Sequence, residues 1–158
     1  MEAVYQILLE GQVTPGLFSR FTRRQVVSRC WRKEAGEWRL KDVPFIDDWK
    51  KEEYDFLVKC LKNTIRTGGF VFGVFYEGSL IAFASVESRR FGSCLQYVQL
   101  SSIHVSCEYR GRGIGKKLFR CAIIAGQKLG AGKLYISSHS AEETQAFYHN
   151  MGCVEAEE

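Results

Sequence analysis

The sequence has no apolar run that approaches the length of a transmembrane helix. Its first residues, MEAVYQILLEGQ, lack the basic segment and the cleavage site of a secretory signal peptide. Low-complexity segments, internal repeats and linkers are absent as well. A chain of 158 residues with this composition is expected to fold as one domain, residues 1–158, with a sizeable core. We therefore expect a cytoplasmic protein with no membrane partner.

A large excess of one charge sign is also missing, because 22 lysines and arginines against 18 acidic residues leave a formal net charge of +4. This charge is too small for the basic footprint of a nucleic-acid-binding protein, and we expect no nucleic-acid partner. It suits a small polyanionic ligand. Basic residues are dense from Arg20 to Lys41. We interpret this density as a solvated sheet face, while an acidic substrate or partner is the alternative.

No two of the six cysteines form a C-x-x-C pair, and none is spaced from a histidine as in zinc sites. The sequence therefore predicts no metal site. They are scattered one per predicted element, as small buried hydrophobic residues are. We expect all six thiols to be reduced. The alternative is a cysteine that carries an acyl group, and Cys107 is best placed for this because a glycine-rich turn follows it.

That turn is the most informative feature of the sequence, in the stretch LSSIHVSCEYRGRGIGKKLFRCAIIAGQKL from residue 100 to residue 129. Strand formers up to Val105 precede the turn, and apolar residues recur at helical spacing after it. Three alternate glycines, Gly111, Gly113 and Gly115, let the backbone approach a ligand, and the N–H groups at a helix start bind phosphate. The stretch therefore predicts a phosphate site. A plain structural turn is the alternative, but it would not need three glycines among four basic residues.

The spacing of the turn excludes two common phosphate-binding motifs. A P-loop ending in Gly115-Lys116 would need a glycine where Arg110 stands. The dinucleotide fingerprint starting at Gly111 would need its third glycine at position 116, which is a lysine. The pattern that remains is R-x-x-G-x-G, formed by Arg110, Gly113 and Gly115.

Together with the preceding strand and a later FYxxxG segment, this pattern resembles the GNAT superfamily of acetyl-CoA-dependent N-acetyltransferases. The later segment is Phe147-Tyr148 followed by Gly152, and the resemblance is best from about residue 70 to residue 152. It implies an α/β fold, a single-domain mixed sheet with helices on both faces and splayed central strands that hold coenzyme A. It also implies two strands after the last helix, where this sequence has room for one. Either the sheet ends early or the missing strand comes from elsewhere, which leaves a homodimer open.

Hydrophobic periodicity and turn residues predict the individual elements. Asp47 or Asp48 is expected to cap the first long helix, which ends at Gly68-Gly69, and Ser140 to cap the last helix, which ends at Gly152. The strand after the glycine-turn helix is expected to be parallel to the strand before it. The predicted strands are 4–9, 25–32, 38–43, 70–76, 80–87, 94–105, 133–138 and one starting at Cys153, and the predicted helices are 15–21, 49–67, 114–129 and 141–151.

The resemblance implies cofactor contacts along the central strand, the turn and the last helix. Main-chain groups of Ile103 and Val105 are expected to pair with the pantetheine amides, as an added strand does. Amides from Gly111 to Lys116 are expected to hold the pyrophosphate, with Arg110 and Arg112 adding charge. The full set expected to bind acetyl-CoA is Ile103, His104, Val105, Arg110, Gly111, Arg112, Gly113, Ile114, Gly115, Lys116, Ser140 and Phe147.

Acyl transfer from a thioester to an amine needs a neutral amine, a polarised carbonyl and protonation of the leaving thiolate. Tyr148 matches the family position of the general acid, and the alternative is that its ring only packs beside Phe147. Glu87 and His104 are the titratable candidates for the base, and we place Glu87 in this role. His104 alternates with the two residues expected to pair with the cofactor, so it faces the other side of the sheet, as a structural histidine would. Ordered water is an alternative proton relay.

We therefore expect an enzyme, a GNAT-type acyl-CoA N-acyltransferase that moves an acetyl group from acetyl-CoA to a primary amine of a small molecule or peptide by direct attack. Two alternatives remain open. One is a catalytically weak module that binds or senses acyl-CoA, because the predicted central strand carries no carboxylate. The other is a protein N-acetyltransferase that acts on lysine or on an N-terminus.

Overall fold

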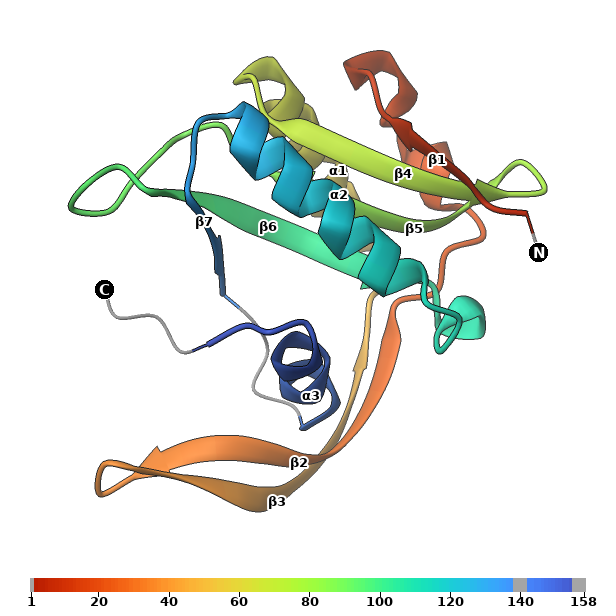
Figure 1. Cartoon of the computed structure of the whole chain (residues 1–158). Helices are drawn as coiled ribbons and strands as arrows, with labels where there is room; N and C mark the ends of the chain where they lie inside the picture. Colours follow the sequence, from red (N-terminus) through yellow and green to blue (C-terminus); the bar gives the residue numbers. More distant parts are fainter. Residues whose placement is uncertain (1, 138–141, 155–158) are drawn as a thin grey trace.

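The computed structural model describes residues 2–137 and 142–154, whose strands and helices are drawn in Figure 1. The strands are β1 Val4–Ile7, β2 Arg24–Glu34, β3 Glu37–Asp48, β4 Phe70–Tyr76, β5 Ser79–Val86, β6 Tyr97–Val105 and β7 Lys133–Ile136. The α-helices are α1 Lys51–Arg66, α2 Ile114–Lys128 and α3 Glu142–Asn150. Five strands form one sheet in the order β1-β4-β5-β6-β7, and β2 pairs with β3 in a separate hairpin. Among the strands of these described residues, only the β6–β7 pair is parallel, as the helical crossover between them predicts.

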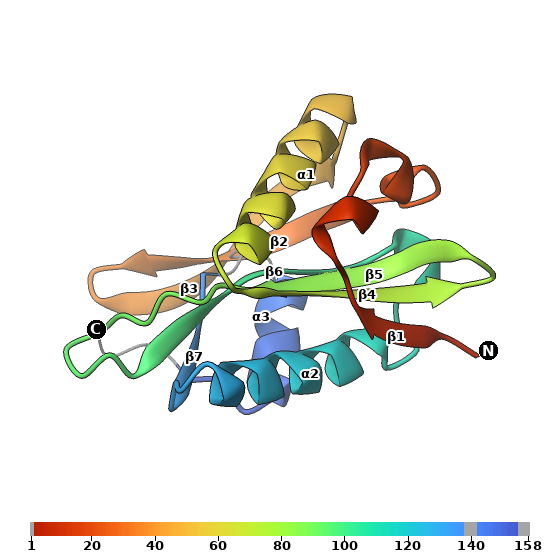
Figure 2. The same ribbon diagram turned by 90° about the horizontal axis from the view of Figure 1, so that it is seen from above.

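Helices cover both faces of the five-stranded sheet, with α1 on one face and α2 and α3 on the other (Figure 2). The sequence of β5, SLIAFASV, is almost entirely apolar because this strand is buried on both sides of the sheet. Ala84 packs into the core beneath α2 with Leu118, and Phe83 packs into the core beneath α1 with Leu61. The predicted mixed sheet with helices on both faces is confirmed.

The central strand β6 has different partners along its two halves, β7 along the first and β5 along the second. It pairs with β5 as far as Val105, but with β7 only from Tyr97 to Leu100. Residues 101–105 therefore present an open edge on the side of β7. The β5–β6 register shifts at the start of this edge, where Val86 pairs with Leu100 and Ser85 with Ser102, so Ser101 is a bulge residue.

The hairpin β2–β3 extends past α3 (Figure 1). Its strands pair from Arg24 opposite Asp48 to the turn at Glu34 and Glu37. The hairpin is joined to α3 by the Arg29–Glu142 ion pair, with contacts of 2.8 and 3.0 Å, and by a 3.2 Å hydrogen bond from the Gln25 amide to the Thr144 hydroxyl. Both strands are longer than predicted because their pairing continues to the start of α1.

The predicted cap of α1 is wrong. Asp47 and Asp48 lie in β3, where they pair with β2, and the N-cap residue is Lys50. The Lys50 amide donates to the Glu53 carboxylate at 3.0 Å, which replaces the expected aspartate cap.

Further differences concern element ends. β6 begins at Tyr97 rather than at residue 94, since residues 93–94 form a turn and Leu95 has a left-handed φ of 53°. Gly152, with a φ of 85°, follows α3 as predicted, but residues 153 and 154 are not in a strand. Ser140 and its predicted cap lie outside the described residues. None of the helices in the described ranges is long and apolar enough to cross a membrane.

Candidate active site

The glycine-rich turn places unpaired amides beside open space. Gly113 is the N-cap residue of α2 and, like Gly111, is left-handed, with φ values of 80° and 77°. A Cβ atom at either position would meet nothing within 4 Å. The first backbone bond of the helix runs from the Lys117 amide to the Gly113 carbonyl at 3.2 Å, so the amides of residues 114–116 have no helical partner. The turn thus has the free donors and the access that a phosphate group requires.

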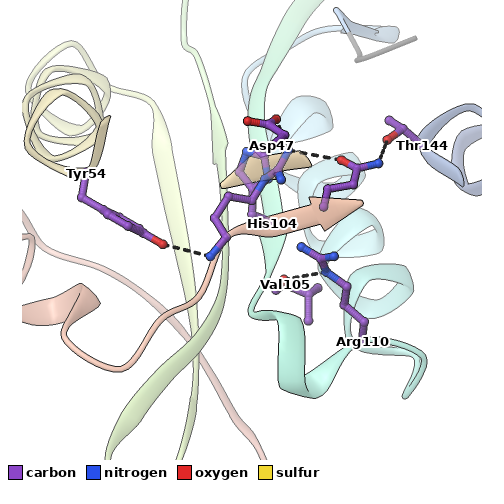
Figure 3. A network of polar contacts seen from close by, with 8 residues as sticks. Asp47, Tyr54, His104, Val105, Arg110 and Thr144 are labelled. Carbon is purple, nitrogen blue, oxygen red and sulfur yellow. Dashed lines mark hydrogen bonds and ion pairs between the residues drawn. The ribbon is translucent and has the colours of Figure 1, made fainter. Parts of the chain in front are cut away.

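The open edge of β6 leads directly to this turn. The Ser106 amide donates to the Ile81 carbonyl at 2.7 Å, so by strand alternation the main-chain groups of Ile103 and Val105 point away from β5. The Val105 carbonyl accepts instead a 3.2 Å hydrogen bond from Arg110 Nε, which Figure 3 draws at the end of the strand. Both residues expected to pair with pantetheine therefore have main-chain groups on the open edge.

Helix α3 closes one side of this edge with two aromatic residues. The Phe147 ring lies about 3.4 Å from where a Cβ atom at Gly115 would stand, and the Val105 side chain also borders that position. Gly115 thus lets α3 approach the first turn of α2. The Tyr148 ring packs against Phe119 and Phe147, with centroids 6.2 and 5.2 Å away. Burial raises the pKa of Tyr148 to about 12, so its phenol is protonated at neutral pH.

On the opposite face of β6, Glu87 ends a chain of hydroxyl groups. Its Oε2 atom accepts hydrogen bonds from Thr64 Oγ1 at 2.8 Å and from Ser101 Oγ. The hydroxyls of Ser101 and Ser102 each bond to the buried Ser85 hydroxyl, at 2.6 and 2.5 Å. The bulge in β6 makes this possible, because it brings two consecutive serines to one partner. The chain links the start of the open edge to a carboxylate that can accept a proton.

Sequence reasoning placed Glu87 among the candidates but missed its partners. Thr64 comes from α1 and Ser85 from β5, so no local pattern connects them with Glu87. The available signal was the Ser101-Ser102 pair, which interrupts the apolar alternation of the central strand.

His104 lies on the α1 face of β6, as its alternation predicted. Its Nδ1 atom accepts a 3.2 Å hydrogen bond from Arg23 Nε, and its ring stands edge-on to Trp49 at 4.8 Å. Burial, together with the charges of Arg23 and Arg110, lowers the pKa of His104 to about 3. Because Nδ1 is the acceptor in a neutral ring, the proton is on Nε2. His104 therefore has no free basic nitrogen and does not face the open edge.

Two cavities meet at the Glu87 end of this face. One, of about 690 Å³, lies between α1 and strands β5 and β6. The other, of about 770 Å³, is bordered by Phe91, Tyr97 and Tyr135. Glu87 and Gln99 line both cavities. Within the described ranges, no three His, Cys, Asp or Glu side chains are grouped so that they could hold a metal ion.

The family model described as "Acetyltransferase (GNAT) family" matches residues 28–153. No curated protein sequence matches the chain. Among solved structures, nourseothricin acetyltransferase superposes with a TM-score of 0.70 at 16% identity, over 96% of this chain and 82% of that one. A putative streptothricin acetyltransferase from Bacillus anthracis, in complex with acetyl coenzyme A, gives 0.69 at 14% identity, over 96% and 83%. Ribosomal-protein-alanine N-acetyltransferase from Brucella melitensis gives 0.64 at 15% identity, over 99% and 95%.

Proposed function

The chain belongs to the acetyltransferase (GNAT) family, and from this premise we propose that it transfers an acetyl group from acetyl-CoA to a primary amine of a small molecule or peptide. Family membership makes the protein an acyl-CoA N-acyltransferase with acetyl-CoA as the donor. The similar solved structures carry the names of different acceptors, so they leave the acceptor of this chain open. The observation that most supports amine chemistry is the Glu87 carboxylate, which is hydrogen-bonded to Ser101 and borders two cavities.

The described residues fit the donor at two places. Amides in the first turn of α2 would hold the pyrophosphate, and the main-chain groups of Ile103 and Val105 would pair with the pantetheine amides. Arg110 is placed to exchange its bond to the Val105 carbonyl for a bond to a phosphate oxygen. The bound donor supplies an acetyl thioester. The four-residue step from Val105 back to Ser101 spans about 13 Å of strand, which would bring the acetyl end close to the Glu87 hydroxyl chain.

Glu87 acts in this proposal as the base for the acceptor. Its carboxylate takes a proton from the substrate ammonium, either directly or through the Ser101 hydroxyl, and leaves a neutral amine. The nitrogen–carbon bond then forms as the carbon–sulfur bond breaks. Glu87 passes the first proton to solvent, and its carboxylate then accepts the second nitrogen proton by the same route. Thr64 and Ser101 fix the orientation of the carboxylate throughout.

Tyr148 acts on the departing sulfur, from the core that contains α2. A phenol with a pKa of about 12 is a weaker acid than a thiol, whose pKa is ordinarily about 8.5. Tyr148 therefore stabilises the departing thiolate by donating a hydrogen bond, while the proton that the thiolate finally takes up comes from solvent. Glu87 and Tyr148 lie on opposite faces of β6, so the base and the hydrogen-bond donor act from different sides of the strand.

The test is release of free thiol from acetyl-CoA in the presence of an amine and peptide panel. Glu87→Gln keeps the shape and removes the base, so turnover should fall about 10²–10⁴-fold. Glu77→Gln, in the turn between β4 and β5, is the control and should match the wild type. Normal turnover of Glu87→Gln would assign the base elsewhere. Calorimetric binding of acetyl-CoA without thiol release from any amine would favour the binding module.

A further inference from the structure

The cavity of about 690 Å³ between α1 and the sheet is lined by many residues besides Glu87 and its hydroxyl chain. We call it the α1 trench. One wall is a single face of α1 together with the preceding Trp49. The other wall consists of polar side chains of the sheet: Ser85, Glu87, Gln99, Ser101, Ser102 and His104.

The charges that line the α1 trench are all negative. Glu52 and Glu53 lie in the first turn of α1, Glu87 lies beside Thr64 near its last turn, and no lysine or arginine of the described residues lines the cavity. The whole chain carries a formal charge of +4, so the trench has the opposite sign to the molecule. Arg23 does not line the trench but is hydrogen-bonded to His104, which does. Its guanidinium forms an ion pair with the Asp47 carboxylate, with a nitrogen–oxygen distance of 3.2 Å. A partly enclosed site of this kind attracts cations.

The acidic ends of the trench are separated by an apolar middle. Phe56, Leu57 and Leu61 line the stretch between them. From Glu53 to Thr64 the helix advances by about 16 Å. On the opposite wall, the strand from Gln99 to His104 also covers about 16 Å. The trench therefore has the length of an extended alkyl chain with a charge at each end.

We propose that the acceptor is an extended aliphatic amine with at least two positive charges, a di- or polyamine, bound along the α1 trench. This inference rests on the function proposed above and adds the substrate class to it. The reacting amine lies at Glu87 and Ser101, next to the open edge of β6. The second ammonium group lies at the Glu52 end, and the alkyl chain covers Leu57 and Leu61.

Length-matched acceptors test the second charge. Thiol release is measured with octane-1,8-diamine and with octylamine, which differ only in the distal amine. The diamine is expected to have at least a tenfold higher kcat/KM, because its distal ammonium gains the acidic end of the trench. Equal kcat/KM values for the two amines would overturn the proposal and leave the general acetyltransferase function standing.

Variants of Glu52 locate the second charge. Glu52→Gln should raise the KM for octane-1,8-diamine about three- to fivefold, and Glu52→Lys about tenfold, which is the range of a partly exposed ion pair and its reversal. The preference for the diamine over octylamine should fall with it. Glu37→Lys, at the start of β3 and outside the trench, makes the same change in net charge and should keep the wild-type preference. A preference that Glu52→Lys leaves unchanged would contradict the proposed orientation.

A binding measurement without acetyl-CoA separates this inference from the proposed function. Cys60 is exposed and lines the trench, so octane-1,8-diamine should slow its alkylation by iodoacetamide, followed by peptide mass spectrometry. Cys94 is exposed outside the trench and is the internal control. If no amine releases thiol, the proposed function fails, and the trench is then judged on Cys60 alone. Alkylation of Cys60 at the same rate with and without the diamine would overturn the trench as a diamine site.

Discussion

Arg23 Nε donates a 3.2 Å hydrogen bond to His104 Nδ1, and this contact joins the start of the hairpin to the central strand. Arg23 is 6% exposed and its guanidinium also contacts Asp47, but the NH1 group has no hydrogen-bond partner. A protonated His104 would bring a second positive charge against it. Burial, together with the nearby charge of Arg23, therefore holds His104 neutral and makes it a fixed structural group rather than a base.

The pH dependence of stability should reveal this pair. The pKa of His104 is about 3 in the folded protein and about 6.5 when unfolded, so the unfolded chain takes up the proton first. Its contribution to stability is complete above pH 6.5 and is lost as the pH falls toward 3. Between pH 6.5 and 5 we expect a loss of roughly 1–2 kcal/mol in urea unfolding. His104→Asn keeps an acceptor for Arg23 without titrating and should remove this loss, whereas the exposed His149→Asn should retain it.

Gly113→Asp should weaken acetyl-CoA binding. Aspartate tolerates the left-handed backbone that Gly113 adopts, but its charge would lie where the phosphate is expected. The matched control is Gly113→Asn, which has the same shape and no charge. We expect calorimetry to give about a tenfold or larger difference in Kd between the two variants. Equal affinities in two folded variants would place the pyrophosphate elsewhere.

Tyr148→Phe should lower kcat with little change in the KM for acetyl-CoA. Only the hydroxyl is removed, so the packing on Phe119 and Phe147 is retained. Loss of one donor to a developing anion typically costs about 10²–10³-fold in kcat. Steady-state kinetics with an acceptor from the panel would measure it. A near-normal kcat would mean that Tyr148 is a packing residue.

The same variant should alter alkaline stability. In wild type, the unfolded chain releases the Tyr148 proton near pH 10, whereas the folded protein keeps it until about pH 12. Stability should therefore fall as the pH rises from 10 to 12, and it should fall less steeply in Tyr148→Phe. Identical slopes for the two proteins would show that the phenol is not buried as described.

The cysteines should titrate as six thiols in the unfolded, unreduced chain, because all six are free in the structure. In the folded protein, the exposed Cys60, Cys94 and Cys107 should react first with a thiol reagent, and the fully buried Cys30 last. Cys107→Ser should retain acetyl transfer, since the proposed reaction needs no acyl-cysteine. Loss of activity in that variant would revive the covalent alternative.

Local features of the sequence were enough to predict the strand, glycine turn and helix around Gly113. A left-handed position followed by amphipathic periodicity is decided by the few residues concerned. The same holds for the hairpin of β4 and β5, whose strands follow from their apolar runs and the Glu77-Gly78 turn. The resemblance that these features carry was enough to predict the family.

Only the tertiary structure decided how the amine side is built. Asp47 does not cap α1 because it lies in β3 and pairs with Gln25 of β2, a residue over twenty positions away. Glu87 gains Thr64 and Ser101 only through the packing of α1 and the bulge in β6. The open edge exists because β7 pairs with β6 for four residues and then ends. Register, bulges and helix packing are set by contacts between distant segments, so no local pattern encodes them.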